Sequence, residues 1–306
     1  MLNYLIRRLL LTVPLALGVV LIVTISFDLI PGDPAALILG EFATPEAVAQ
    51  LRTSLGLDRS LPVRFVNYVG DILRGDLGNS IRDRRPVTAI LAETFPFTAT
   101  LSAAAFALVV LIGIPLGVTS ASRPGSWLDN LVRVVSLVGL SMPVFWTGIV
   151  FVVIFSVQLG WTPVSGTGTW RHLVLPSLTL ALPSIAVVAR MTRSTVLEVL
   201  REDFVRTAKA KGVAERSTLY KHTLRNALIP VVTIIGLQLG QMLGGAVLTE
   251  TVFAWPGVGR LTVFAIFNRD FVLMQGLVLV LALLYLLLNL LVDLSYGLID
   301  PRVRYS

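Results

Sequence analysis

The sequence predicts an all-α polytopic membrane protein with six transmembrane helices and a helical extracytoplasmic loop between spans 1 and 2. Hydrophobic residues make up 55% of the 306 residues, and charged residues only 14%. A soluble domain of this length would need far more polar surface to cover its core. Two further observations support this class: a set of charge-free apolar stretches, and an uneven placement of lysine and arginine between them.

The apolar stretches are long enough to cross a hydrocarbon core of about 30 Å, which takes about 20 helical residues. None of them contains Asp, Glu, Lys or Arg. We expect the fourth to continue past Arg190 and Arg193, whose long side chains can reach the lipid headgroups. The first is longer than the apolar run of a signal peptide, so we expect an uncleaved span. The six stretches cover residues 9–27, 98–118, 134–161, 173–189, 226–249 and 271–292.

The loop charges orient these spans. Residues 190–225 hold nine Lys and Arg against four acidic residues. Positive residues collect in cytoplasmic loops, so this segment is predicted to be cytoplasmic, and with six spans the N and C termini share that side. The same rule explains the net charge of +7, so we expect no nucleic-acid partner.

The outer loop has helix signals of its own. Thr44 as N-cap, Pro45 at the first position and Gly56 as a stop predict one helix, and residues 61–73 predict a second. The segment GDLGNS, residues 75–80, is turn chemistry. The expected organisation is a first span (1–30), an extracytoplasmic loop (31–97), a membrane core (98–298) with a cytoplasmic loop (195–225), and a cytoplasmic tail (299–306).

Enzyme and metal signatures are missing from the sequence. It has no cysteine and two histidines far apart, and it lacks the GxxxxGK[ST], HExxH and GxSxG motifs. We therefore expect no catalytic residue, no metal site and no cofactor bound by this chain. Asp293, late in the last span, is more easily explained by an interfacial position or a helix partner than by a direct transport role.

The fifth span carries a stripe of small residues. Gly236, Gly240 and Gly244 follow at four-residue steps, a spacing that lets another helix approach closely. Gln238 and Gln241 lie off the stripe, and an amide in mid-membrane needs a partner or water. The pattern fits packing within the chain and a span that lines a wet pathway or a dimer interface equally well.

A basic corner joins the fourth and fifth spans. An apolar stripe at four-residue steps predicts an amphipathic helix over 195–211 that continues out of the fourth span, and Gly212 predicts its stop. A second helical piece is expected from about Glu215. The charge alone would fit a loop that touches only lipid headgroups, but small residues at the corner favour a docking element for a partner protein. These small residues are Ala208, Ala210, Gly212 and Ala214.

Several segments in order resemble bacterial ABC importer permeases, most closely the dipeptide/oligopeptide/nickel branch. The corner is similar to the EAA loop of that family, although Arg206 replaces the usual Glu and Arg225 stands where many members have Pro. The other matching segments are GDLGNS (75–80), LPSLTLALP (175–183), ETVFAWPGVGRL (250–261) and DPRVR (300–304). The resemblance assigns ATPase coupling to Arg206, Thr207, Ala208, Lys209, Ala210, Lys211, Gly212, Val213, Ala214 and Glu215.

The resemblance implies a multi-subunit importer in the prokaryotic cell membrane. Its expected partners are a second permease subunit, two ATP-binding subunits that use ATP and Mg, and an extracytoplasmic substrate-binding protein. Di- or oligopeptides are the expected substrate, with nickel chelates, glutathione or other small solutes as alternatives. An ion-coupled secondary transporter is the competing class, but it needs mid-membrane acidic residues that this sequence does not offer.

Overall fold

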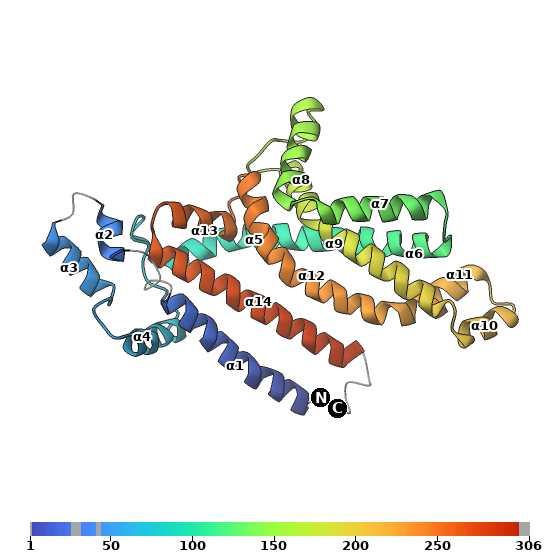
Figure 1. Cartoon of the computed structure of the whole chain (residues 1–306), viewed down its shortest axis with the longest axis horizontal. Helices are drawn as coiled ribbons and strands as arrows, with labels where there is room; N and C mark the ends of the chain where they lie inside the picture. The colour runs from blue at the N-terminus through green and yellow to red at the C-terminus, as the bar shows by residue number, and fades with distance from the viewer. Residues whose placement is uncertain (1, 26–31, 41–43, 300–306) are drawn as a thin grey trace. The chain divides into compact units, whose positions relative to one another are not determined.

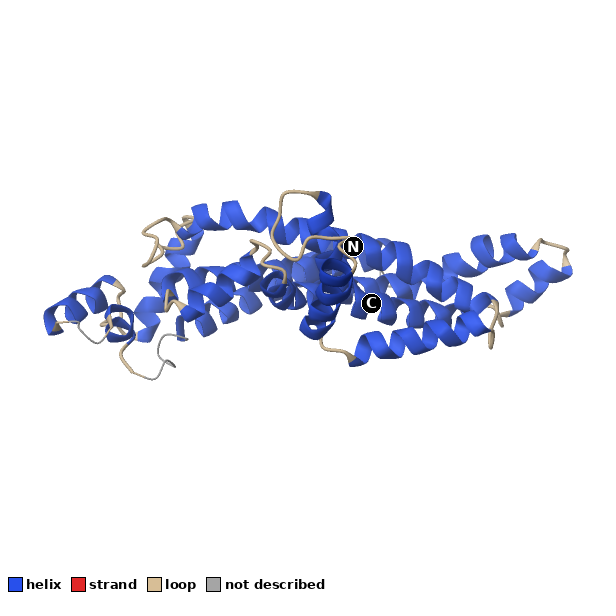
Figure 2. Ribbon diagram, turned by 90° about the horizontal axis from the view of Figure 1, so that it is seen from above, coloured by secondary structure: helices blue, strands red, loops and turns tan. Residues whose placement is uncertain are grey.

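The computed structural model describes residues 2–25, 32–40 and 44–299, with side chains for residues 10–25, 32–40 and 44–292. Within these ranges every regular element is a helix, apart from one isolated antiparallel bridge between Asn79 and Pro86 (Figure 2). The all-α class is therefore confirmed. The side chain of Asp293, most of the expected tail at 299–306 and the junction at 26–31 lie outside the described residues.

The chain divides into two compact units, Met1–Pro96 with Gly257–Leu290, and Phe97–Pro256 with Leu291–Ser306. The first unit holds the loop expected between spans 1 and 2, together with the beginning of the chain and residues 257–290. Its helices are α1 (Leu2–Ile25), α2 (Pro34–Leu39), α3 (Pro45–Ser54), α4 (Leu61–Leu73), the start of α5 (Val87–Leu108), α13 (Val258–Phe267) and most of α14 (Phe271–Ile299) (Figure 1).

Local signals define the loop helices of the first unit. The Thr44 hydroxyl caps α3 by accepting a hydrogen bond from the Ala47 amide at 3.3 Å, and Pro45 takes the first position. After α3 ends, Gly56 adopts a left-handed φ of 66°. The predicted cap, first residue and stop of α3 are confirmed, and so is the predicted helix at Leu61–Leu73.

The turn at residues 75–80 is held by one buried carboxylate. Asp270 accepts hydrogen bonds from the Ser80 hydroxyl at 2.5 Å and from the amides of Ile81 and Arg82 at 3.1 and 3.3 Å. It also accepts from the Leu273 amide at 3.1 Å, which caps the start of α14. The Asp270 carboxylate thus fastens the loop to the first turn of a membrane helix.

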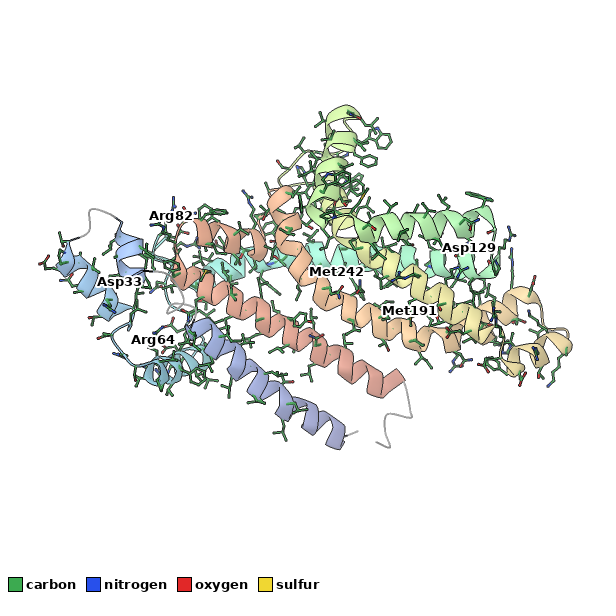
Figure 3. The ribbon with its side chains drawn as sticks, viewed as in Figure 1. Asp33, Arg64, Arg82, Asp129, Met191 and Met242 are labelled. Atoms are coloured by element: carbon green, nitrogen blue, oxygen red, sulfur yellow. The ribbon has the colours of Figure 1, made fainter. Side chains whose placement is uncertain are left out.

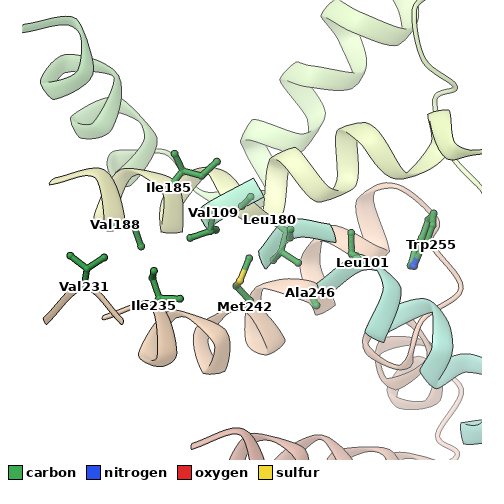
Figure 4. Packing of buried hydrophobic residues seen from close by; sticks show 12 residues of the cluster. Leu101, Val109, Leu180, Ile185, Val188, Val231, Ile235, Met242, Ala246 and Trp255 are labelled. Atoms are coloured by element: carbon green, nitrogen blue, oxygen red, sulfur yellow. The ribbon is translucent and has the colours of Figure 1, made fainter. Parts of the chain in front are cut away.

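The second unit is built around α9. Its elements are the rest of α5, the π-helical η1 (Val109–Gly113), α6 (Ile114–Ser122), α7 (Trp127–Ser141), α8 (Val144–Phe151), π-helical η2 (Val152–Gln158), α9 (Trp170–Val199), α10 (Asp203–Ala210), α11 (Glu215–Ser217), π-helical η3 (Thr218–Thr223) and α12 (Leu224–Val252). α6, α7, α8 and α12 all pack on α9. Buried side chains from α5, α9 and α12, including Leu180, Val188 and Met242, fill the space between them (Figure 4).

Close approach of α6 to α9 depends on a glycine. A Cβ added to Gly117 would lie 2.5 Å from the Thr192 Cβ and 2.6 Å from the Ala189 carbonyl oxygen. Because real Cβ atoms do not come this close to such neighbours, any larger residue would force the two helices apart.

Among the described residues, four helices are long and apolar enough to cross a membrane, namely Val87–Ser122, Trp170–Val199, Glu215–Val252 and Phe271–Val292. The helices Trp127–Ser141 and Val144–Gln158 are long and apolar enough together, so the number rises to five if this bent pair is one span. Leu10–Ile25 is a shorter apolar helix. The polytopic membrane class is confirmed at this level. The number of six spans and the side of the termini stay predictions.

The helix predictions were wrong at two places. The expected third span, 134–161, is two helices bent by 110°. Pro143 explains the bend, because it cannot donate to the helical ladder and it forces Met142 into an extended conformation (ψ 130°). The expected helix 195–211 is also broken, because α9 ends at Val199 and α10 begins at Asp203. The break buries Val205 completely and leaves Phe204, a member of the expected apolar stripe, 43% exposed.

Candidate functional site

The basic corner forms one continuous structure at the ends of α9 and α12. It comprises α10, α11 and the turn between them, residues 203–217, and is called the α10–α11 corner below. Figure 1 shows it at the end of its unit, beyond the last turn of α9 and before the start of α12. The structure brings all ten residues assigned to ATPase coupling by resemblance onto this corner.

Gly212 ends α10 in a specific hydrogen-bond pattern. The Val213 amide donates to the Ala208 carbonyl at 3.2 Å, and the Gly212 amide donates to the Lys209 carbonyl at 3.0 Å. These two bonds make a Schellman motif, in which the residue after the C-cap is left-handed. Gly212 has a φ of 76°, so the predicted glycine stop is confirmed. A Cβ at Gly212 would meet nothing within 4 Å, so backbone conformation and not space requires glycine here.

The corner presents a small and polar outer surface. Only Ala208 and Val213 among the ten residues are partly covered. Thr207 donates its hydroxyl to the Asp203 carbonyl at 2.9 Å, and Arg206 forms an ion pair with the Asp203 carboxylate at 3.6 Å. The exposed members are Arg206, Thr207, Lys209, Ala210, Lys211, Gly212, Ala214 and Glu215. Small residues and long charged side chains thus share the exposed surface of the corner.

Buried contacts attach the corner to the membrane helices. Val205 is fully buried, and α10 packs against η3, which runs without interruption into α12. Beneath it, Val118, Val196 and Ala227 form a small core shared by α6, α9 and α12. Movement of the corner is thus tied to three membrane helices through packed side chains.

A buried ion pair lies close to this core, and the sequence prediction missed it. Asp129 is 0% exposed and accepts hydrogen bonds from Arg193 Nε at 2.6 Å and Nη2 at 2.9 Å. The Ser120 hydroxyl at 2.5 Å and the Gly125 amide at 2.9 Å complete its donors. Figure 3 shows Asp129 at the α6–α7 end of the unit. The expectation that Arg193 extends to the lipid headgroups was wrong, because a carboxylate lies within its reach. The signal available in the sequence was a charged residue near the end of each of two neighbouring apolar stretches, with opposite signs that could pair.

The five candidate pathway or interface residues of α12 differ in burial. Gly236 and Gly240 are buried, and Gln238 is buried and donates from Nε2 to the Ser184 hydroxyl at 3.0 Å. Gln241 and Gly244 are exposed. The first three residues pack within this chain, whereas the other two point away from it.

The part of the chain that the structure describes shows no candidate metal site. No group of three or more His, Cys, Asp or Glu side chains lies close enough together there to hold a metal ion.

Comparison with known proteins identifies the family of this chain. Residues 113–305 match the family described as binding-protein-dependent transport system inner membrane component, and residues 1–102 match the N-terminal component of the same system. The chain is 46% identical over 306 residues to a glutathione transport system permease protein (GsiC) of Pectobacterium atrosepticum. It is 43% identical over 336 residues to a dipeptide transport system permease protein (DppB) of Alkalihalophilus pseudofirmus. Both alignments cover 100% of each chain.

Solved structures with a similar fold come from ABC transporters. The inward-facing MetNI methionine ABC transporter matches with a TM-score of 0.58 at 20% identity, over 69% of this chain and 96% of that chain. An amino acid ABC transporter crystallised with histidines matches with a TM-score of 0.56 at 14% identity, over 69% and 94%. These matches show the family of this chain, a multi-pass bacterial inner-membrane protein. It belongs to the inner membrane components of binding-protein-dependent transport systems, which are the permeases of ABC importers.

Proposed function

We propose that this chain is the permease subunit of an ATP-driven importer of short peptides and that ATPase subunits drive it through the α10–α11 corner. The observation that carries the proposal is the corner itself, a glycine-stopped helix with an exposed small-residue surface at the ends of two long membrane helices. A docked partner that changes shape would move these helix ends. A partner shifts the equilibrium between two states only if it contacts them differently. The packed side chains of the corner can transmit that difference to the membrane helices.

ATP and Mg are assigned to the partner subunits. The sequence lacks a phosphate-binding GxxxxGK[ST] loop, so its own residues offer no such cradle for nucleotide. ATP hydrolysis is therefore expected on separate chains, and this chain acts as a transport subunit.

The proposed topology has six spans with both termini in the cytoplasm. The four long helices supply four spans, and the bent pair α7–α8 with η2 and the helix α1 supply one each. This arrangement places the α10–α11 corner in the cytoplasm, where its lysines and arginines satisfy the positive-inside rule. It places α2, α3 and α4 outside, where the substrate-binding protein is expected to dock.

A second permease subunit is the proposed neighbour of the exposed face of α12. Leu237, Gln241, Gly244 and Leu248 are exposed at helical spacing and so share one side of the helix. An amide on this side needs a partner helix or water. The face is therefore assigned to the pathway or the subunit interface, with Gln241 and Gly244 as its candidate residues. Gly236, Gln238 and Gly240 are buried and pack within this chain.

Short peptides are the proposed substrate class. Full-length relatives are named for dipeptide, di/tripeptide and glutathione transport. Glutathione is the second candidate, favoured by the GsiC relative at 46% identity. The binding protein does most of the selecting, so the two candidates are best separated with the cognate binding protein.

Reconstitution of the complete importer tests the proposal. Proteoliposomes with both permeases, the ATPases and the binding protein should hydrolyse ATP faster when a loaded binding protein is added outside. Uptake of a labelled dipeptide and of labelled glutathione then identifies the substrate. Uptake that follows an ion gradient without ATP would refute the proposal in favour of a secondary transporter.

A further inference from the structure

A cavity of about 670 Å³ lies between the α6–α7 turn and the α10–α11 corner. Its walls come from the end of α6, the start of α7, the residue after α9, and the α10, α11 and η3 segments. Figure 1 shows the α6–α7 turn and α11 at the same end of this unit. Its wall shares Lys209 and Glu215 with the ten residues assigned to ATPase coupling, and the rest of the lining has no part in that role.

The cavity is rich in positive charge. Arg123, Lys209 and Arg216 line it, against the single carboxylate of Glu215. Arg123 has no ion-pair partner among the described residues, and neither do Lys209 and Arg216. Two guanidinium groups and an ammonium group around one space suit a phosphate, because guanidinium groups donate paired hydrogen bonds to its oxygens.

Neutral side chains add donors and an apolar wall. The Ser126 hydroxyl accepts from the Asp129 amide at 3.2 Å, which leaves its own proton free to donate into the cavity. Tyr220 lines the same space and brings a second hydroxyl. Leu200 and Leu219 form an apolar side. A ligand that matches this lining carries an anionic head and an adjoining hydrocarbon part.

The cavity lies at the level where membrane helices end. The candidate spans Val87–Ser122 and Glu215–Val252 have terminal residues in its wall, and the span Trp170–Val199 ends beside Leu200. Trp127 is 75% exposed and Tyr220 56% exposed, and both border the cavity. Exposed Trp and Tyr side chains at helix ends are typical of the membrane–water interface. The exposed Trp127 and Tyr220 side chains therefore favour a position of the cavity near the lipid headgroups.

We propose that this cavity binds the phosphate-bearing headgroup of an anionic phospholipid. Basic pockets between membrane helices are suited to such headgroups, and the leucine side accounts for the start of the acyl chains. Inorganic phosphate alone would leave that apolar side unused. Because Lys209 belongs to α10, a bound lipid would hold the α10–α11 corner against the α6–α7 turn. That last consequence rests on the proposed coupling function, whereas binding itself does not.

Quenching of tryptophan fluorescence by brominated lipids tests the site. The full-length chain is reconstituted in phosphatidylcholine vesicles that contain brominated phosphatidylglycerol or brominated phosphatidylcholine. The Trp127→Phe variant supplies the background of the other tryptophans. We expect phosphatidylglycerol to quench Trp127 at about tenfold lower mole fraction than phosphatidylcholine, and the double variant Arg123→Gln/Arg216→Gln to lose this preference.

The matched control is Arg201→Gln/Arg225→Gln, which removes the same charge from exposed residues outside the cavity lining. This control should keep the preference. Equal quenching by both lipids, an unchanged preference in the cavity variant, or an equal loss in the control would overturn the proposal. Displacement of the lipid by inorganic phosphate would identify a free-anion site instead, and displacement by the ATPase subunits would identify a protein contact. The assay needs neither ATP nor peptide, so it is independent of the proposed function.

Discussion

Asp129 accepts two hydrogen bonds from Arg193, and this pair joins α7 to α9 six residues before α9 ends at Val199. Ser120 and Gly125 donate to the same carboxylate, so α6 and the α6–α7 turn are fixed by the same group. Four hydrogen bonds satisfy a carboxylate that is fully buried. The pair therefore fixes the arrangement of three helices next to the α10–α11 corner.

Asp129→Ala should destabilise the protein strongly. It leaves the Arg193 charge in a partly covered site without its partner, and breaking such a pair costs about 3 kcal/mol of unfolding free energy. The measurement is the thermal unfolding midpoint of the detergent-solubilised chain. The control is Asp203→Ala, which removes an ion pair exposed on both sides and should cost at most about 0.5 kcal/mol. Equal losses in the two variants would contradict the structural role of Asp129.

Substitution of Gly212 should uncouple ATP hydrolysis from uptake. Gly212→Trp forces a bulky residue into a left-handed position on the docking surface and should leave membrane insertion intact. The structure adds a control, because Asn tolerates this conformation better than other residues. Gly212→Asn should keep most of the coupling, measured as peptide imported per ATP hydrolysed. Normal transport by Gly212→Trp would show that the corner is not the docking site.

Two glycines of the same stripe should respond differently. A Cβ at Gly236 would lie 2.3 Å from Val292 Cγ1, whereas a Cβ at Gly244 would meet nothing within 4 Å. Gly236→Ala should therefore cost about 1–3 kcal/mol of stability through overpacking. Adding Val292→Ala should restore part of that loss, because the two changes are coupled.

Gly244→Leu should leave the isolated chain as stable as the wild type. If α12 meets the second permease subunit here, the same change should reduce the amount of that subunit that co-purifies. Destabilisation of the isolated chain by Gly244→Leu would show that this face is covered within the chain. Undiminished co-purification and uptake would remove Gly244 from the interface and the pathway.

Asp270→Ala should loosen the turn at residues 75–86. The amides of Ile81 and Arg82 lose a charged acceptor, and a hydrogen bond of this kind contributes about 1.5–3 kcal/mol. We expect their hydrogen exchange to become at least about tenfold faster by mass spectrometry. Asp83→Ala, at an exposed residue of the same turn, is the control and should leave exchange unchanged. Unchanged exchange in Asp270→Ala would show that the turn is held by other contacts.

Features that depend on neighbouring residues were predictable from the sequence. The cap and first residue of α3, the bounds of α4 and the glycine stop at Gly212 follow from backbone chemistry within a few residues. The membrane class was predictable in the same way, because apolar stretches of this length can span a bilayer whatever the rest of the chain contacts.

Features that depend on partners were not predictable. The break after Val199 arises where local preference and tertiary packing disagree, because Val205 is buried there. The bend at Pro143, by contrast, has a local cause in the proline itself. The partner of Arg193 is 64 residues away in the chain, so no local pattern names it. The burial of Gln238 and Gly236 likewise depends on Ser184 and Val292, which are distant in the sequence.

The exposed face of α12 also bears on how the cell balances its subunits. Gln241 has no hydrogen-bond partner among the described residues, and in a chain that stays alone its amide would face lipid. If the proposed second permease covers this face, an unassembled copy would display a polar group in the bilayer and an assembled copy would hide it. Under that proposal the exposed amide would distinguish surplus copies from assembled ones.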